Sequence, residues 1–185
     1  MDPASRTVAS DRAGAHWAPV VIVVGIIAIV VGGGQVLARA VAPAVGGVVH
    51  AGAVEVQPWP GWDVESVTTA TARLHRGPVV LDIVASGPDA TGPASIAVRY
   101  VEERLRPMLA QLVPTAPELV VLPSGATAAR IGYVGLTPDG LPIEGVVTAL
   151  AGPGSSAVFD AVAPRGELIG VAEDVQAMID EAVVP

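Results

Sequence analysis

A run of uncharged residues between Arg12 and Arg39 constrains this chain more than any other feature of its sequence. The run covers residues 13–38, which is 26 positions, and residues 18–31 are almost entirely Val, Ile and Ala. A helix rises about 1.5 Å per residue and a bilayer core is about 30 Å thick, so about 20 apolar residues span it. A helix also satisfies its own backbone hydrogen bonds in lipid. The run therefore predicts a transmembrane anchor, which we assign to residues 18–42.

A cleaved signal peptide is the alternative interpretation of the same segment. Ala38-Arg39-Ala40 is a triplet that a signal peptidase accepts, and Arg6 and Arg12 precede the apolar run. Against cleavage, the run is longer than the roughly 7–15 residues of an ordinary signal core. A buried core helix would need another domain to cover it on all sides. We therefore favour the anchor over the other two interpretations.

Flanking arginines predict the orientation of the anchor. Arg6, Arg12 and the α-amino group precede it, whereas Arg39 follows it and the next basic residue is Arg73. Because basic residues stay on the cytoplasmic side, residues 1–17 are expected to form a cytoplasmic tail. The expected location is the cytoplasmic membrane, crossed once, with the C-terminal domain outside the cytoplasm. The inverted topology, with the domain in the cytoplasm, is the alternative.

The rest of the chain divides into a short tether and one domain. Residues 43–53 are small, uncharged and Gly-rich, which indicates a flexible tether. Residues 54–185 have the length of a single domain, and from His50 onward the chain has seven Arg and sixteen Asp or Glu. This acidic balance argues against nucleic acid as a partner. The absence of Cys excludes disulfides, thiolate metal sites and a lipid-modified Cys.

Hydrophobic periodicity predicts strands first, then a helix, then more strands and a final helix. The expected strands are residues 54–57, 64–74, 79–84, 119–122, 128–136, 143–151 and 157–163, and the expected helices are residues 94–112 and 166–183. Thr91 is a possible N-cap of the first helix, which Pro107 should kink near Glu103. Residues 128–163 contain three strands joined by tight turns, which indicates an antiparallel meander. The fold class predicted is α+β, an antiparallel sheet packed by two helices.

This order of elements resembles the PsbP-like fold, which also occurs in actinobacterial envelope proteins of the LpqN type. The residues that carry the resemblance are the entry at 56–62, the meander at 130–133 and 145–148, and the closing strand and helix at 159–164, 168 and 174–179. A chain without Lys and Asn and rich in Ala, Val, Gly and Arg is compatible with an actinobacterial origin. LpqN-type proteins carry a lipidated Cys, which a membrane helix would replace here. The resemblance implies a non-catalytic binding or assembly module.

The sequence contains no motif that assigns a catalytic, cofactor or metal site. The three histidines, His16, His50 and His75, lack zinc-ligand spacing. The serines of residues 152–156 do not form a nucleophile elbow. We therefore predict no enzyme activity and no cofactor. A hydrolase built on a serine with His75, or on two carboxylates, is the alternative that we keep open.

Three carboxylates lie on predicted strands, namely Asp82, Glu144 and Asp160. Carboxylates on strands usually face water, which is the interpretation adopted for all three. Arg130, the one basic residue of the meander, is available to pair with one of them. Such a pair at the surface contributes little to stability.

Four residues are candidate partner contacts: Trp59, Trp62, Glu173 and Asp174. Trp62 is interpreted as a core residue beside its glycine turn, and Trp59 is left as core or contact. The acidic face of the last helix is interpreted as solvated, with docking of a basic partner as the alternative. The predicted partners are the membrane and an envelope protein or a lipidic ligand. An apolar crevice between a helix and the sheet would favour the ligand.

Overall fold

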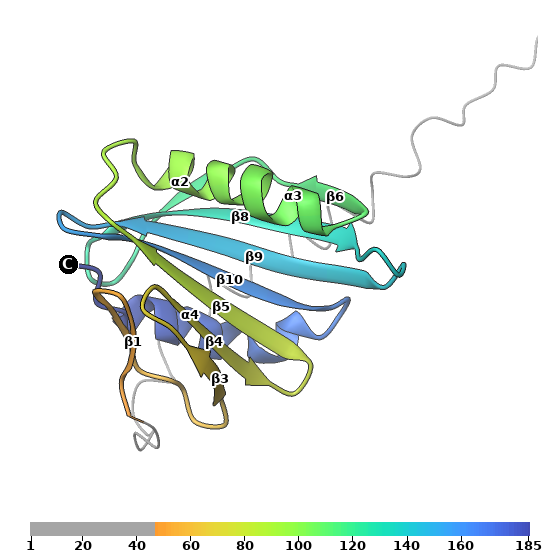
Figure 1. Cartoon of the computed structure of the whole chain (residues 1–185), viewed down its shortest axis with the longest axis horizontal. Helices are drawn as coiled ribbons and strands as arrows, with labels where there is room; N and C mark the ends of the chain where they lie inside the picture. Colours follow the sequence, from red (N-terminus) through yellow and green to blue (C-terminus); the bar gives the residue numbers. More distant parts are fainter. Residues whose placement is uncertain (1–46) are drawn as a thin grey trace, which may run out of the picture.

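The structure is a computed structural model that describes residues 47–185 (Figure 1). The predicted tail, the anchor at residues 18–42 and the first part of the tether lie outside the described residues. Within residues 47–185, no helix combines the length and the apolar character that crossing a bilayer requires.

The described chain forms ten strands and two helical regions. The strands are β1 Val49–Ala51, β2 Val54–Val56, β3 Asp63–Val67, β4 Thr71–Arg76, β5 Val79–Ser86, β6 Gln111–Pro114, β7 Glu118–Val121, β8 Thr127–Leu136, β9 Pro142–Ala151 and β10 Ser156–Pro164. The first helical region comprises α2 Pro93–Tyr100, the π-helical turn η1 Val101–Leu105 and α3 Arg106–Met108. The second comprises the 3-10 turn η2 Leu168–Val171 and α4 Ala172–Glu181.

One antiparallel sheet of eight strands is the centre of the domain. Its order is β3-β4-β5-β10-β9-β8-β6, and β7 pairs with β8 beside β6. The predicted meander is confirmed, since β8 pairs with β9 and β9 with β10 in continuous register. The predicted α+β class, an antiparallel sheet with two helical regions, is confirmed as well.

Helices cover both faces of this sheet (Figure 1). Side chains on a strand alternate between the faces, so each strand contributes to two separate apolar clusters. Leu81, Phe159 and Ala161 pack on one side with α4, η2 and the β1–β2 hairpin. Ile131, Val147 and Val158 pack on the other side with α2 and η1. The two faces therefore have independent environments for any polar group that they carry.

The predicted single strand at residues 64–74 is wrong, because the chain reverses direction within it. β3 and β4 form an antiparallel hairpin whose turn starts at Thr68. The Thr68 hydroxyl accepts the backbone N–H groups of Ala70 and Thr71 at 3.3 and 3.0 Å. A threonine can therefore close a turn as well as fill a strand, and the Thr-rich composition alone does not separate the two.

The first helix ends earlier than predicted, at Met108 instead of residue 112. Pro107 has no N–H to donate to the carbonyl of Glu103, and the helix widens there into the π-turn η1, as expected for a disturbance at that position. Leu112 instead belongs to β6. The predicted N-cap Thr91 is also wrong, because its hydroxyl donates to Asp89 at 2.5 Å and Gly92 holds the cap position.

The domain begins before the predicted boundary at residue 54. Val49 and Ala51, assigned above to the tether, are buried in β1 and pair with β2. Gly52 adopts a positive φ of 60° and closes this hairpin, so the glycine that indicated flexibility makes a tight turn.

Candidate functional site

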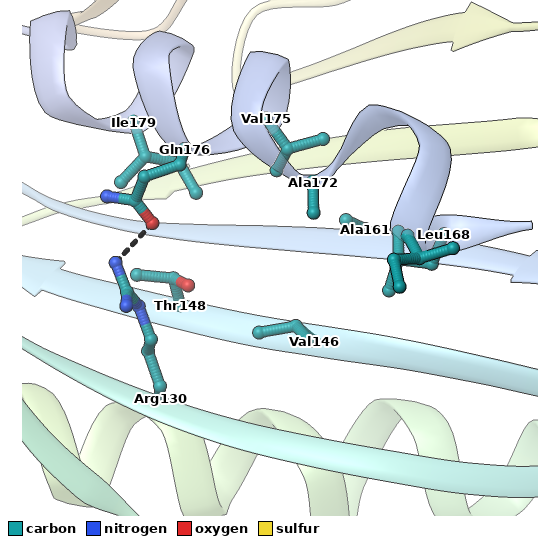
Figure 2. Close-up of a pocket in the computed structure, with 10 residues that line it drawn as sticks. Arg130, Val146, Thr148, Ala161, Leu168, Ala172, Val175, Gln176 and Ile179 are labelled. Carbon is teal, nitrogen blue, oxygen red and sulfur yellow. Dashed lines mark hydrogen bonds between the residues drawn. The ribbon is translucent and has the colours of Figure 1, made fainter. Parts of the chain in front are cut away.

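A crevice lies between the second helical region and the sheet (Figure 2). Its cavity has a volume of about 40 Å³. The lining residues come from β8, β9 and β10 on the sheet side and from η2 and α4 on the helix side: Arg130, Val146, Thr148, Ala161, Leu168, Ile169, Ala172, Val175, Gln176 and Ile179. An apolar crevice between helix and sheet is therefore present.

Small side chains account for the gap under α4. Ala161 on β10 and Ala172 at the start of α4 both line it, and neither is long enough to close the space between sheet and helix (Figure 2). Leu168, Val175 and Ile179 are buried around them and hold the helix in place. Because protein interiors are otherwise close-packed, this gap lined by alanines is a local departure from the packing of the core.

The crevice is polar at one end and apolar at the other. In Figure 2, Arg130 and Gln176 meet at the end opposite Leu168, with Val146 on the floor between them. A nitrogen of the Arg130 guanidinium donates to the Gln176 side-chain oxygen. The Gln176 amide in turn donates to an oxygen of Asp180 at 2.5 Å. This polarity is suited to a ligand with one polar head and one apolar part.

Burial lowers the pKa of Arg130, while the nearby charges of Asp180 and Glu118 oppose this effect. A guanidinium remains protonated in proteins, so Arg130 is a cation in a largely apolar space. The strand carboxylates Asp82, Glu144 and Asp160 are not its hydrogen-bond partners, because the side chain reaches α4 and bonds Gln176 instead.

A second polar cluster lies on the opposite face of the sheet, around Asp160. Asp160 is 2% exposed, and it accepts hydrogen bonds from the hydroxyls of Tyr133 at 2.8 Å and Tyr100 at 3.2 Å. Burial raises its pKa from 3.8 to about 7, although the bond from Tyr133 opposes the shift. The prediction that Asp160 faces water is wrong, because β10 lies in the middle of the sheet and Tyr100 of α2 covers this face.

The other two strand carboxylates also have protein partners. Asp82 accepts from Arg73 at 2.6 and 2.8 Å, in a two-pronged ion pair across β4 and β5. Glu144 is 5% exposed and accepts the backbone N–H groups of Gly166 and Leu168 at 2.9 and 3.3 Å. Glu144 therefore fixes the turn that leads into η2 and the crevice, and the prediction that it faces water is wrong.

Asp82 and Asp160 are direct cross-strand partners, so two carboxylates do converge. His75 lies on the same face, because it is two residues from Arg73 on β4. Asp160, however, is closed off by the two tyrosines, and Asp82 is held by Arg73. Acid–base catalysis requires a substrate to reach such a pair. The crevice is on the other face of the sheet, so a ligand bound there does not contact these carboxylates.

The candidate partner contacts lie in different environments. Trp62 is 6% exposed, which confirms it as a core residue, and Trp59 is half-buried against the same core. Asp174 forms an ion pair with Arg76 of β4, so it ties α4 to the sheet. Glu173 is exposed. A contact at Trp59 or Glu173 stays a prediction.

No family model matches this sequence, and no curated protein sequence matches it. Comparison with solved structures shows that the domain has the PsbP-like fold. The solution structure of cyanobacterial PsbP (CyanoP) from Synechocystis sp. PCC 6803 matches with a TM-score of 0.55 and 12% identity, over 80% of this chain and 99% of that chain.

Two further structures share the fold. The crystal structure of LpqN, involved in cell envelope biogenesis of Mycobacterium tuberculosis, matches with a TM-score of 0.54 and 11% identity, over 70% of this chain and 82% of that chain. The protein Mog1 matches with a TM-score of 0.51 and 10% identity, over 75% and 95% of the two chains. At these identities the comparison establishes the fold, and function has to be argued from the site.

Proposed function

We propose that this chain is a single-pass membrane-anchored protein of the cell envelope whose PsbP-like domain is a non-catalytic module that binds a lipidic ligand. The observation that carries this proposal is the apolar crevice under α4, with one cationic side chain at one end. The LpqN structure, described for a protein of cell envelope biogenesis, shares the fold and supports the envelope setting. The uncharged residues 13–38 support the anchor.

The chemistry of the crevice favours binding over catalysis. Its lining offers apolar contacts from Val146, Leu168 and Val175, which stabilise an apolar ligand by about 25 cal/mol per Å² removed from water. The polar groups at its end are a guanidinium, an amide and a hydroxyl, from Arg130, Gln176 and Thr148 (Figure 2). A threonine hydroxyl needs an adjacent base to act as a nucleophile, and neither the guanidinium nor the amide is a general base at neutral pH.

Filling the crevice should remove binding. Ala172→Leu adds three carbons to the crevice wall at the first residue of α4, where leucine is compatible with a helix. An uncharged photoreactive alkyl probe is added to membranes that contain the full chain, and label is measured in residues 168–179. We expect this labelling to fall severalfold in Ala172→Leu. Ser95→Leu is the matched control, because Ser95 is a small, exposed residue of α2, across the sheet. Equal labelling of both variants and the unmodified chain would contradict the crevice as the binding site.

The orientation follows from the arginines around the predicted anchor and is tested separately. We expect alkaline phosphatase, fused through a flexible linker after Pro185, to be active in cells, because that enzyme needs an oxidising compartment for its disulfides. The same fusion placed directly after residue 17 should be inactive. An inactive C-terminal fusion at normal protein levels would establish the inverted topology and would overturn the extracytoplasmic location.

A further inference from the structure

We propose that the ligand of this crevice is a single-chain aliphatic carboxylate, with its carboxylate on Arg130 and its chain extending along Val146 and Ala161 toward Leu168. The proposal rests on the proposed function and specifies the chemical class of the ligand. It depends on three observations: the donors of Arg130, the charges around it, and the size and lining of the cavity.

Arg130 can bind an anion without losing its present partner. A guanidinium carries five N–H donors in a planar fork, and the hydrogen bond to Gln176 uses one of them. The side chain is half-buried and lines the cavity beside Thr148 (Figure 2). Charge-assisted bonds between a guanidinium and a carboxylate are commonly two-pronged, and a water-poor site strengthens them. Arg130 is thus suited to a planar oxyanion at this end of the crevice.

The surrounding charges favour an anion of charge −1. Glu118 is the cross-strand partner of Arg130, and Asp180 accepts from Gln176. Burial lowers the pKa of Arg130, and the charges of these two carboxylates oppose that lowering. Their negative charge already balances part of the guanidinium charge. A carboxylate adds one negative charge, whereas a phosphate monoester adds about −1.5 to −2 at neutral pH and meets more repulsion. A carboxylate is therefore favoured over a phosphate monoester.

The cavity determines the shape of the apolar part. A volume of about 40 Å³ corresponds to a few water molecules, since one water needs about 10–15 Å³ by this measure. This space admits a narrow chain but not a sugar or fused-ring system. Ile169 lines the cavity and is 50% exposed, so the crevice opens to solvent at η2. A chain that enters beside Ile169 can place its first carbons inside and leave the rest outside.

Competition against a photoreactive probe tests the head group. Membranes that contain the full chain are labelled with a decanoate carrying a diazirine on its chain, and label is quantified in residues 168–179. We expect octanoate to compete at about tenfold lower concentration than octanol or octyl phosphate. A charge-assisted hydrogen bond raises affinity by about tenfold or more. Equal competition by octanol and octanoate would overturn the carboxylate assignment.

Variants locate the charge that recognises the head group. Arg130→Gln should weaken octanoate competition about tenfold and leave octanol competition unchanged, whereas Arg104→Gln should change neither. Arg104 is exposed on η1, across the sheet from the crevice, and its substitution removes the same charge. The comparison of octanoate with octanol on the unmodified chain does not depend on the folding of any variant.

The outcomes separate this inference from the proposed function. Crevice labelling without a preference for the carboxylate overturns the ligand class and leaves the binding module in place. The absence of crevice labelling by both the charged and the uncharged probe overturns both proposals. A preference for octanoate that persists in Arg130→Gln overturns the role of Arg130.

Discussion

The stability of the domain should fall as the pH rises from about 4 to about 7, and Asp160→Asn should remove most of this fall. The carboxyl of Asp160 has a pKa of 3.8 in the unfolded reference and about 7 in the fold. The folded state therefore binds more protons in this range, so raising the pH favours unfolding. A rise in pKa of this size corresponds to about 4 kcal/mol of stability, which is lost as the pH rises from about 4 through about 7. Asn keeps the shape of the protonated acid but does not ionise.

Urea unfolding of the full chain in nanodiscs at several pH values measures this effect, with tryptophan fluorescence as the signal. The unmodified chain should lose stability toward pH 8. At pH 8, Asp160→Asn should be more stable than the unmodified chain. Asp139→Asn is the control, because Asp139 lies in an exposed turn and its pKa is lowered, chiefly by the hydrogen bond from Thr137. If the curves of the unmodified chain and Asp160→Asn stay parallel from pH 4 to pH 8, the buried carboxyl does not titrate as described.

Gly145→Ala should destabilise the domain by about 3–5 kcal/mol. A Cβ at Gly145 on β9 would lie within 2.6 Å of two ring carbons and the hydroxyl oxygen of Tyr133 on β8. The two residues are cross-strand partners, so the ring packs directly on the glycine. Moving the ring also separates the Tyr133 hydroxyl from Asp160, which leaves a buried carboxyl with one hydrogen bond fewer. Overpacking and the lost hydrogen bond add in this case.

Gly132→Ala is the matched control for this substitution. Gly132 is also a strand glycine, but its Cβ would meet Thr115 at 3.7 Å, which is an ordinary contact. Its free energy of unfolding should therefore change by less than about 1 kcal/mol. Urea unfolding of both variants under one set of conditions makes the comparison. Similar destabilisation in the two would show that the close approach of Tyr133 is not the cause.

The sequence predicts the framework of the fold because strand and helix periods are local signals. The meander follows from its turn residues, for example Asp139-Gly140 between β8 and β9. Periodicity does not distinguish the β3–β4 hairpin from one long strand, because Thr68 is compatible with both a strand and a turn. Pro107 predicts a disturbance of the first helix. The end of the helix at Met108 and the strand β6 after it are not predicted, because Leu112 fits the apolar stripe of the helix.

The candidate site was harder to predict than the fold. The burial of Asp160 depends on Tyr100, which is 60 residues away in sequence and reaches it from α2. The Arg130–Gln176 contact likewise joins β8 to α4 across 46 residues. One signal was available for Arg130: it lies between Ala128 and Gly132 on the side of β8 where α4 packs. A single arginine among small residues on one strand face can thus indicate a polar end to an apolar site.

The two faces of the sheet divide the roles of the polar residues. On the α2 face, the hydroxyls of Tyr133 and Tyr100 both donate to Asp160 and enclose its carboxylate. On the α4 face, Arg130 and Gln176 line a cavity. Substitutions at the Asp160 cluster should therefore act on stability, and substitutions at the crevice should act on ligand binding.

We propose that the crevice under α4 holds a ligand with an aliphatic chain. The most direct test is to purify the full chain from its native membranes under mild conditions, extract it with organic solvent and identify the extract by mass spectrometry, with Ala172→Leu purified in parallel. We expect an aliphatic carboxylate in near-equal amount to the protein in the extract of the unmodified chain, and none in the extract of Ala172→Leu. An extract that contains the same bulk membrane lipids for both proteins, and nothing specific to the unmodified chain, would contradict it.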